Sequence, residues 1–239
     1  MARSKVKAVA LLSGGLDSVV ATTVAARKPG GVALALTFDY GQRSARREAR
    51  AARAVAEELN IEWKLVKLPW LAELLPEALG KASGALPRPK TNDLDDLSRA
   101  RETARAVWVP NRNGVFVNVA AAFAESIGAR DVVAGFNREE AATFPDNSPE
   151  FMRRATAALA LSTANRVRLV SPTARLDKAG IVRLGLKTKA PLAHVWSCYD
   201  VGARMCGSCE SCARLLRALE KAKAPPESRP RALPRPAGR

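Results

Sequence analysis

Residues 13–18 have the sequence Ser13-Gly14-Gly15-Leu16-Asp17-Ser18, and this stretch decides the expected fold. The apolar run Val6 to Leu12, which has the length of a strand, precedes it, and residues 18–27, which are compatible with a helix, follow it. Two adjacent glycines let the backbone turn sharply, so that consecutive N–H groups can close around an anion. The start of the following helix adds its positive dipole end. The hexapeptide therefore predicts a phosphate-binding loop.

This loop differs from the two commoner nucleotide-binding signatures. It lacks the lysine of G-x-x-x-x-G-K-S/T, and its glycines do not fit G-x-G-x-x-G. Ser13 and Ser18 supply hydroxyl donors, whereas Asp17 is a carboxylate that could order the loop or hold a magnesium ion beside the phosphates. The alternative is a Gly-Gly turn that only joins a strand to a helix.

Strand-like and helix-like segments alternate on both sides of the loop, as a parallel α/β sheet requires. Ligands of such sheets bind at the carboxyl ends of the strands, where both the loop and residues 37–40 are expected. Phe38 and Tyr40 could lie under an adenine ring or could be ordinary core aromatics. The expected strands cover Val6 to Leu12, Val32 to Thr37, Ile61 to Leu68, Asp131 to Gly135 and Val167 to Val170. The expected helices cover 17–27, Ser44 to Leu59, Val115 to Ser126, about 149–163, and a segment capped by Asp177 that ends at Leu186.

Composition narrows the class of protein further. The chain has 239 residues, 47% of them hydrophobic, which suits one α/β core with a small extension. We see no run long enough to span a membrane and no secretory leader, so the expected location is the cytoplasm and no membrane partner is expected. Gly-, Pro- and Asp-rich residues from Gly80 to about Arg101 predict a mobile surface segment or lid.

The formal net charge is +16, which raises the question of nucleic-acid binding. Part of this charge lies in a Pro-, Arg- and Lys-rich tail after Lys221, which we expect to be disordered. Five arginines between residues 43 and 53 would spread around much of a helix, so that solvated arginines and an RNA-binding surface are both compatible with the pattern. The charge therefore allows a contact with tRNA without requiring one.

Four cysteines lie close together near the C-terminus, at Cys198, Cys206, Cys209 and Cys212. Four thiolates satisfy a closed tetrahedral site, so we expect a structural Zn²⁺ ion, with an iron–sulfur cluster as the alternative. His194 is the only histidine, and it is either a hydrogen-bonded structural residue or a neighbour that tunes the metal site. With one histidine and every cysteine committed to metal, the chain cannot build a Cys-His glutaminase site.

Four segments together resemble one family, the 7-cyano-7-deazaguanine synthases known as QueC, over nearly the whole chain to about Ala218. Residues 13–18 look like the pyrophosphate loop of the ATP pyrophosphatases. Tyr40-Gly41-Gln42-Arg43 matches Y-G-Q-R, residues 109–113 are similar to V-P-G-R-N, and Cys198-Tyr199 with the three later cysteines matches the zinc motif. The resemblance implies a Rossmann-like α/β sheet of the adenine nucleotide alpha hydrolase type (PP-loop, HUP). It also implies a PP-loop domain over 1–190, a zinc-binding extension over 191–222 and a basic tail over 223–239.

The implied activity is that of an ATP-dependent carbon–nitrogen ligase of queuosine or archaeosine biosynthesis. It would convert 7-carboxy-7-deazaguanine and ammonia into 7-cyano-7-deazaguanine, or preQ0, through an adenylated intermediate. The alternative is an adenylating enzyme that acts on a tRNA base or another deazapurine-like acceptor. The resemblance also implies ATP, Mg²⁺ and Zn²⁺ as cofactors and a homodimer as the assembly.

The resemblance assigns functional residues as follows. The expected catalytic residues are Ser13, Asp17, Ser18, Arg43 and Arg112, the two arginines as clamps for phosphate or carboxylate or else as members of surface ion pairs. The expected nucleotide-binding residues are Leu12, Ser13, Gly14, Gly15, Leu16, Asp17, Ser18, Val19, Val20, Ala21 and Thr22. The expected metal ligands are Cys198, Cys206, Cys209 and Cys212.

Two segments depart from the family pattern. The pattern G-V-x-x-x-D-x-S-G-Y-P-D-C-R is replaced by Gly135-Phe136, then Glu140 and residues 142–148, where Ala142 and Phe144 lack the hydroxyls of the pattern. Asn111 replaces the glycine of V-P-G-R-N, at which a special backbone shape could be required. These changes leave adenylation intact and place the identity of the acceptor in question.

Overall fold

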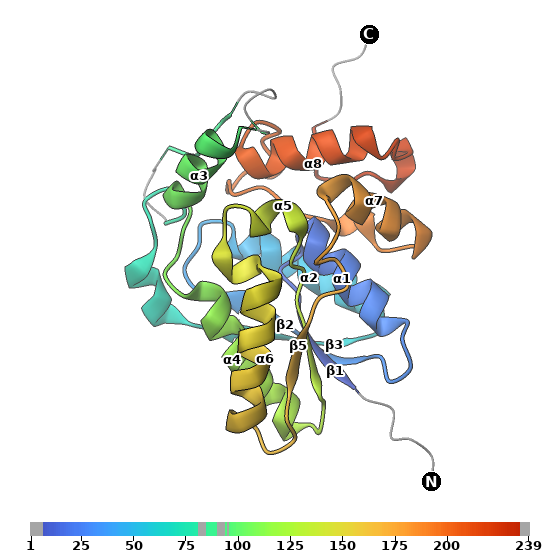
Figure 1. Cartoon of the computed structure of the whole chain (residues 1–239). Coiled ribbons are helices and arrows are strands. Elements are labelled where there is room, and N and C mark those ends of the chain that lie inside the picture. The colour runs from blue at the N-terminus through green and yellow to red at the C-terminus, as the bar shows by residue number, and fades with distance from the viewer. Residues whose placement is uncertain (1–6, 81–84, 90–93, 95, 235–239) are drawn as a thin grey trace.

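The computed structural model describes residues 7–80, 85–89, 94 and 96–234. A parallel sheet of five strands forms its centre, in the order β3-β2-β1-β4-β5 (Figure 1). The strands are β1 (Ala8–Leu11), β2 (Val32–Asp39), β3 (Glu62–Lys67), β4 (Asp131–Val133) and β5 (Arg168–Val170). The helices are α1 (Leu16–Ala26), α2 (Ala45–Glu58), α3 (Leu97–Ala106), α4 (Arg112–Ser126), α5 (Arg138–Ala141), α6 (Pro149–Ser162), α7 (Lys178–Lys187) and α8 (Glu210–Lys221). Short 3₁₀ turns cover Pro69–Leu74, Pro145–Asn147, Leu192–His194 and Pro226–Ser228.

The strand order places β1 between β2 and β4, so the chain leaves β1 in one direction across the sheet and later returns on its other side. At such a switch point the connections diverge beyond the carboxyl ends of the strands and leave a crevice. Residues 13–18 follow β1 at this point, as the sequence predicts. The parallel α/β fold is therefore confirmed, and the sheet sets the place of the candidate site.

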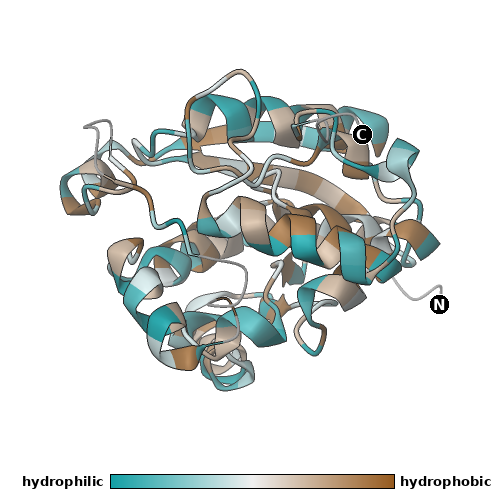
Figure 2. Ribbon diagram, turned by 90° about the horizontal axis from the view of Figure 1, so that it is seen from above, coloured by the Kyte–Doolittle hydropathy of each residue, from teal (hydrophilic) through white to brown (hydrophobic). Residues whose placement is uncertain are grey.

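Two hydrophobic layers hold the helices against the sheet. Alternation along β2 turns Ala35 toward the layer that contains α1, α2, α7 and α8, and turns Leu34 and Leu36 toward the layer that contains α4 and α6. Figure 1 shows α4 and α6 side by side on their face of the sheet, and α7 beside α8 above the strand ends. Figure 2 shows hydrophobic and hydrophilic residues alternating along the covering helices, as expected for helices with one face on a core.

Three helices were not anticipated from the sequence, namely α3, α5 and α8. The first lies at the edge of the predicted lid, of which residues 81–84, 90–93 and 95 fall outside the described residues. The second is a single turn, too short for a periodic pattern. The third begins directly after Cys209 and contains Cys212, so that its first turn was assigned to the metal site and not to a helix. No helix within the described ranges is both long and apolar enough to cross a membrane.

The segment after residue 222 differs from the expected disordered tail. As far as Pro234, it lies against the cysteine-containing segment, with Ala224 and Leu233 buried in the same hydrophobic cluster as the cysteines. The main-chain N–H of Met205 donates to the carbonyl of Ala232 at 2.9 Å. Burial of these two apolar side chains stabilises the segment against the core, whereas the basic composition of the tail predicted disorder.

Candidate active site

The loop between β1 and α1 is closed by its own two serines. The Ser13 and Ser18 hydroxyls lie 3.1 Å apart, and the Ser18 hydroxyl donates to the carbonyl of Gly15 at 3.0 Å. The N–H of Gly15 donates to Oγ of Ser13 at 3.3 Å. Gly15 is the N-cap of α1 and makes no side-chain cap, so the first N–H groups of the helix are available to an anion.

Close packing of the backbone explains why two positions around this loop are glycine. Gly14 has a positive φ of 82°, and an added Cβ would lie 2.8 Å from the Cβ of Ala51 in α2. At Gly135, just beyond β4, an added Cβ would lie 2.5 Å from the N of Ser18. Both contacts are shorter than real Cβ atoms tolerate. Side chains at these positions would displace the loop from its place over the strand ends.

A cavity of about 250 Å³ lies over the loop, and it shares lining residues, among them Leu16, Arg112 and Lys178, with a smaller cavity of about 100 Å³. Of the expected nucleotide-binding residues, five loop residues and Leu12 line the larger cavity: Leu12, Ser13, Gly15, Leu16, Asp17 and Ser18. Val19, Val20, Ala21 and Thr22 are instead buried within α1 and face the protein core. Only the first turn of α1 therefore lines the larger cavity.

Aromatic side chains form the wall of the larger cavity that faces the loop. Phe38 and Phe116 stack with centroids 4.2 Å apart, and Tyr40 packs against Phe116 at 5.5 Å. Thr37 does not take part, because its hydroxyl donates to the carbonyl of Leu12 and accepts from Trp63. This wall offers a flat apolar surface of the kind that an adenine ring contacts.

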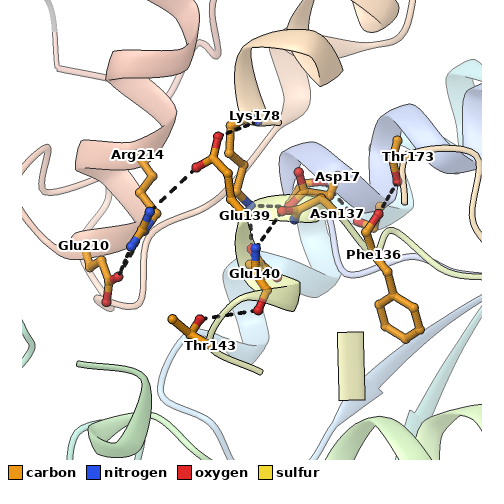
Figure 3. Close-up of polar contacts among 12 residues, drawn as sticks. Asp17, Phe136, Asn137, Glu139, Glu140, Thr143, Thr173, Lys178, Glu210 and Arg214 are labelled. Carbon is orange, nitrogen blue, oxygen red and sulfur yellow. Dashed lines mark hydrogen bonds and ion pairs between the residues drawn. The ribbon is translucent and has the colours of Figure 1, made fainter. Parts of the chain in front are cut away.

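Lys178, which was not singled out from the sequence, lies at the centre of the polar side of the cavity (Figure 3). Its ammonium contacts the carboxylate of Asp17 and lies 2.5 Å from that of Glu140, although only 13% of its side chain is exposed. The sequence did contain one indication of this role. Lys178 follows the N-cap Asp177 and so lies in the first turn of α7, where the helix dipole disfavours a cation. The carboxylates of Asp17 and Glu140 offset this unfavourable interaction.

The charges of Asp17, Lys178 and Glu140 shift one another's pKa values. Burial raises the pKa of Asp17 to about 6, because the opposing effect of Lys178 is smaller. Burial acts to lower the pKa of Lys178, but the two carboxylates outweigh it and hold that pKa above the ordinary value. The same ion pair holds the pKa of Glu140 below its usual range despite burial. Oδ1 of Asp17 is buried and lacks a hydrogen-bond partner in the described part of the chain.

Glu139 connects this cluster to the cysteine-containing extension. One of its carboxylate oxygens accepts from the main-chain N–H of Lys178 at 2.8 Å, and the other lies 3.6 Å from the guanidinium of Arg214 in α8 (Figure 3). Arg214 also pairs with Glu210 at 2.8 Å. The short helix α5 therefore holds the start of α7 and the start of α8 together.

The two arginines that were expected in the site have different surroundings. Arg112 lies at the start of α4, lines both cavities and contacts the hydroxyl of Tyr40 at 3.4 Å. None of the ion pairs found among the described residues involves Arg112. Arg43 pairs with Asp200 at 2.9 Å and lines neither of these two cavities. The structure thus brings Arg112 to the candidate site and Arg43 to the cysteine-containing segment.

The four cysteines converge as expected. Their sulfur atoms all lie within 4.8 Å of one another, and those of Cys198 and Cys209, like those of Cys206 and Cys212, are 4.0 Å apart. A tetrahedral ion with metal–sulfur bonds of about 2.3 Å places its sulfurs about 3.8 Å apart. A four-iron cluster attaches its thiolates to separate irons and needs a wider spacing. The donor set therefore fits one shared ion.

Segments around these cysteines reach the cavities directly. Ser197 and Tyr199, on either side of Cys198, line both cavities. The N–H of Trp196 donates to the carbonyl of Gly14 at 2.9 Å.

His194 lies 3.0 Å from the carboxylate of Glu58, as expected for a hydrogen-bonded structural histidine.

Comparison with known proteins agrees with this geometry. A family model described as "Queuosine biosynthesis protein QueC" matches residues 7–223. The 7-cyano-7-deazaguanine synthase of Desulforamulus reducens is 54% identical over 211 residues, which cover 88% of this chain and 92% of that protein. The synthase of Pelotomaculum thermopropionicum is 48% identical over 216 residues (90% and 97%), and that of Methanosarcina mazei is 45% identical over 217 residues (90% and 94%).

The chain belongs to the QueC family. The resemblance stated from the motifs is thereby confirmed over nearly the whole chain. Of these motifs, Y-G-Q-R forms the turn after β2: the amide of Gln42 accepts from the N–H of Tyr40 and donates to the carbonyl of Phe38 and to Glu48. An added Cβ at Gly41 would lie 2.7 Å from that of Ala72. The motif thus shapes the strand end that carries the aromatic wall.

The replacement of the QueC glycine by Asn111 has a local explanation. Asn111 adopts the left-handed conformation, with φ 52° and ψ 23°, at the N-cap of α4. Asparagine tolerates this region better than other side chains do. An added Cβ at Gly114 would lie 2.1 Å from Oδ1 of Asn111, so the glycine one turn later leaves room for the amide. Asn111 therefore adopts a backbone conformation that glycine also adopts readily.

The altered segment between β4 and α6 lies beside both cavities. Glu140 is engaged by Lys178, whereas Thr143 and Phe144 line the smaller cavity and Asn147 lines both. Phe144 stacks on Trp108 with centroids 6.0 Å apart. The segment therefore forms part of the lining of the smaller cavity.

Proposed function

We propose that this chain is a 7-cyano-7-deazaguanine synthase, which uses ATP to convert 7-carboxy-7-deazaguanine and ammonia into preQ0. The relatives named for this activity match it over about nine-tenths of both chains. The observation that supports the reaction most directly is that the loop of residues 13–18 and Arg112 line the same two adjoining cavities. Arg112 is a cation that forms none of the ion pairs found in the described part of the chain. Activation of a carboxylate by ATP requires both the loop and a cation of this kind.

In this proposal, ATP lies with its phosphates on residues 13–18 and its adenine against the aromatic wall of Phe38 and Phe116. N–H groups at the start of α1 hold the β and γ phosphates, and Ser13 and Ser18 add hydroxyl donors. Lys178 is positioned to neutralise charge on the phosphates as pyrophosphate departs. The α phosphorus then faces the smaller cavity.

The acceptor would lie in the smaller cavity, where Arg112 can bind its carboxylate bidentately. A carboxylate oxygen attacks the α phosphorus, pyrophosphate leaves, and a mixed anhydride with AMP forms. Ammonia attacks the activated carbonyl and releases AMP, a proton and the amide. A second ATP activates the amide oxygen in the same way, and loss of AMP and a proton gives the nitrile. The loop thus acts on two successive oxygens of one substrate.

We also propose one Zn²⁺ ion on the four cysteines and Mg²⁺ at the phosphates. The sulfur separations support a single tetrahedral ion. Oδ1 of Asp17, buried and without a hydrogen-bond partner among the described residues, is the oxygen available to Mg²⁺. Metal would supply a rigid closed site at the cysteines and charge neutralisation at the phosphates. Elemental analysis of the purified protein tests zinc against iron.

We further propose, from the family resemblance alone, that the enzyme acts in the cytoplasm as a homodimer. Its substrates are small molecules, so that the activity requires no contact with tRNA. Sedimentation velocity tests the dimer.

A direct assay tests the activity. The protein is incubated with ATP, Mg²⁺, ammonium and 7-carboxy-7-deazaguanine, and AMP, pyrophosphate, amide and nitrile are followed by chromatography. We expect nitrile in wild-type protein and a strong loss with Arg112→Gln, mainly as a higher KM for the acceptor. Formation of AMP with unmodified tRNA, and no nitrile with the free base, would instead favour an enzyme that acts on a tRNA base.

A further inference from the structure

The hydrogen bond between the N–H of Trp196 and the carbonyl of Gly14 has no part in the reaction scheme above. It joins the phosphate-binding loop, near the start of the chain, to the segment that enters the cysteine cluster. Trp196 is 5% exposed, so water does not compete for this bond.

A loop that binds phosphate has to present N–H groups and keep carbonyl oxygens away from the anion. In a trans peptide the C=O and the following N–H point in opposite directions. Because Trp196 fixes the carbonyl of Gly14, the N–H of Gly15 in the same peptide points away from Trp196. It donates to the Ser13 hydroxyl, which lines the cavity. The bond thus fixes the orientation of the peptide that carries the first N–H of the phosphate site.

The position of Trp196 is itself fixed from two directions. Its indole N–H donates to the carbonyl of Cys198 at 2.9 Å, and the guanidinium of Arg47 lies 5.5 Å from the centre of its ring. Arg47 belongs to α2, the helix whose Ala51 packs against Gly14 on another side. Gly14 is therefore enclosed by α2 and Trp196, which also contact each other.

We propose that Trp196 is a positioning residue for the phosphate-binding loop: its main-chain N–H orients the Gly14–Gly15 peptide toward the phosphates, and its indole ties that orientation to Cys198 of the cysteine cluster. The inference rests on the proposed use of ATP. It assigns the cysteine-containing segment a role in phosphate binding in addition to its role in folding.

The test separates binding of phosphate from binding of the nucleoside. Calorimetry measures the Kd of pyrophosphate and the Kd of adenosine for wild-type protein, Trp196→Phe and Trp196→Leu. Phenylalanine removes the indole N–H and part of the bicyclic ring but keeps an aromatic ring beside Arg47, so we expect pyrophosphate to bind about threefold more weakly, the loss expected for one net hydrogen bond. Leucine also removes the ring that contacts Arg47, and about a tenfold loss is expected.

Adenosine affinity is expected to remain within about twofold in both variants, with the metal content per chain unchanged. Trp70→Phe is the matched control, because Trp70 is 49% exposed on the turn after β3. Equal losses of pyrophosphate and adenosine affinity would overturn the inference, as would unchanged affinity for pyrophosphate.

A measurement on the wild-type chain covers the case in which a variant does not fold. Hydrogen exchange of the Trp196 amide is compared with and without pyrophosphate, and we expect bound pyrophosphate to slow it. An unchanged exchange rate would contradict the proposed link between the Trp196 amide and phosphate binding. A wild-type protein that binds neither ATP nor pyrophosphate would refute the proposed function itself, whereas one that binds both but tolerates Trp196→Phe would refute only this inference.

Discussion

Gly135 lies directly against the main chain of Ser18, so that an added Cβ would come within 2.5 Å of the Ser18 nitrogen. The end of β4 thus supports the first turn of α1 from below, at the point where its N–H groups face the larger cavity. The phosphate-binding loop is shaped by this neighbouring strand as well as by its own glycines.

Gly135→Ala is expected to displace the loop. The methyl group meets backbone rather than a flexible side chain, so that the main chain of α1 has to move. We expect stability to fall by about 1–3 kcal/mol and ATP affinity to fall by more than tenfold. Urea unfolding and calorimetry measure the two effects. Gly128→Ala is a suitable comparison because an added Cβ there meets nothing within 4 Å, although its positive φ adds a small strain.

Lys178→Gln is expected to leave two carboxylates facing each other without their cation. Removing one member of a buried ion pair is costly, and we expect a loss of about 2 kcal/mol or more in the free energy of unfolding. The double variant with Glu140→Gln should recover part of that loss, because one uncompensated charge is removed with it. Lys187→Gln, at the exposed end of the same helix, should cost little. A double variant no more stable than the single one would contradict this account.

The pH dependence of ATP use follows from Asp17. Burial raises its pKa to about 6, and the charge of Glu140 adds to the rise. Above that pH Asp17 is ionised and available to Lys178 or Mg²⁺, and as the pH falls through about 6 it gains a proton. We therefore expect kcat/KM for ATP to decrease below about pH 6. Glu140→Gln removes a like charge and should move this acid limb to lower pH; an unmoved limb would assign it to another group.

Truncation after residue 222 is expected to weaken the metal site. It removes Ala224 and Leu233, both buried beside the cysteines, together with the main-chain bond between Met205 and Ala232. Loss of the buried leucine alone corresponds to about 2 kcal/mol. We expect a lower Tm and faster loss of zinc to a chelator, whereas truncation after residue 234 should match the full chain. Equal zinc retention in both would show that the tail is dispensable.

The sequence was most informative where a function depends on residues that are close together along the chain. Residues 13–18 include five residues that line the larger cavity, and the four cysteines, which are close in sequence, bring their sulfur atoms within 4.8 Å of one another. Apolar segments also predicted the strands: β1 and the central part of β2 are buried, as expected for a parallel sheet with helices on both faces, whereas the edge strand β3 is partly exposed.

Residues whose roles depend on distant partners were not found in this way. Lys178 acquires its significance from Asp17, which the fold brings beside it from another strand end. Arg43 was expected either as a clamp for phosphate or carboxylate or as a member of an ion pair. It pairs with Asp200, and no local pattern in the sequence distinguishes these outcomes. Asn111 departs from the family pattern, yet its compensation at Gly114 could be recognised only from the backbone conformation.

The hydrogen bond from Trp196 to Gly14 also bears on when the nucleotide site can form during synthesis of the chain. The loop emerges from the ribosome well before the tryptophan that fixes it, the cysteines and the covering Leu233. Contacts between such distant residues form late in folding. The nascent chain can therefore assemble its sheet once β5 has been made, but it acquires a finished nucleotide site only after the segment from Trp196 to Leu233 has followed.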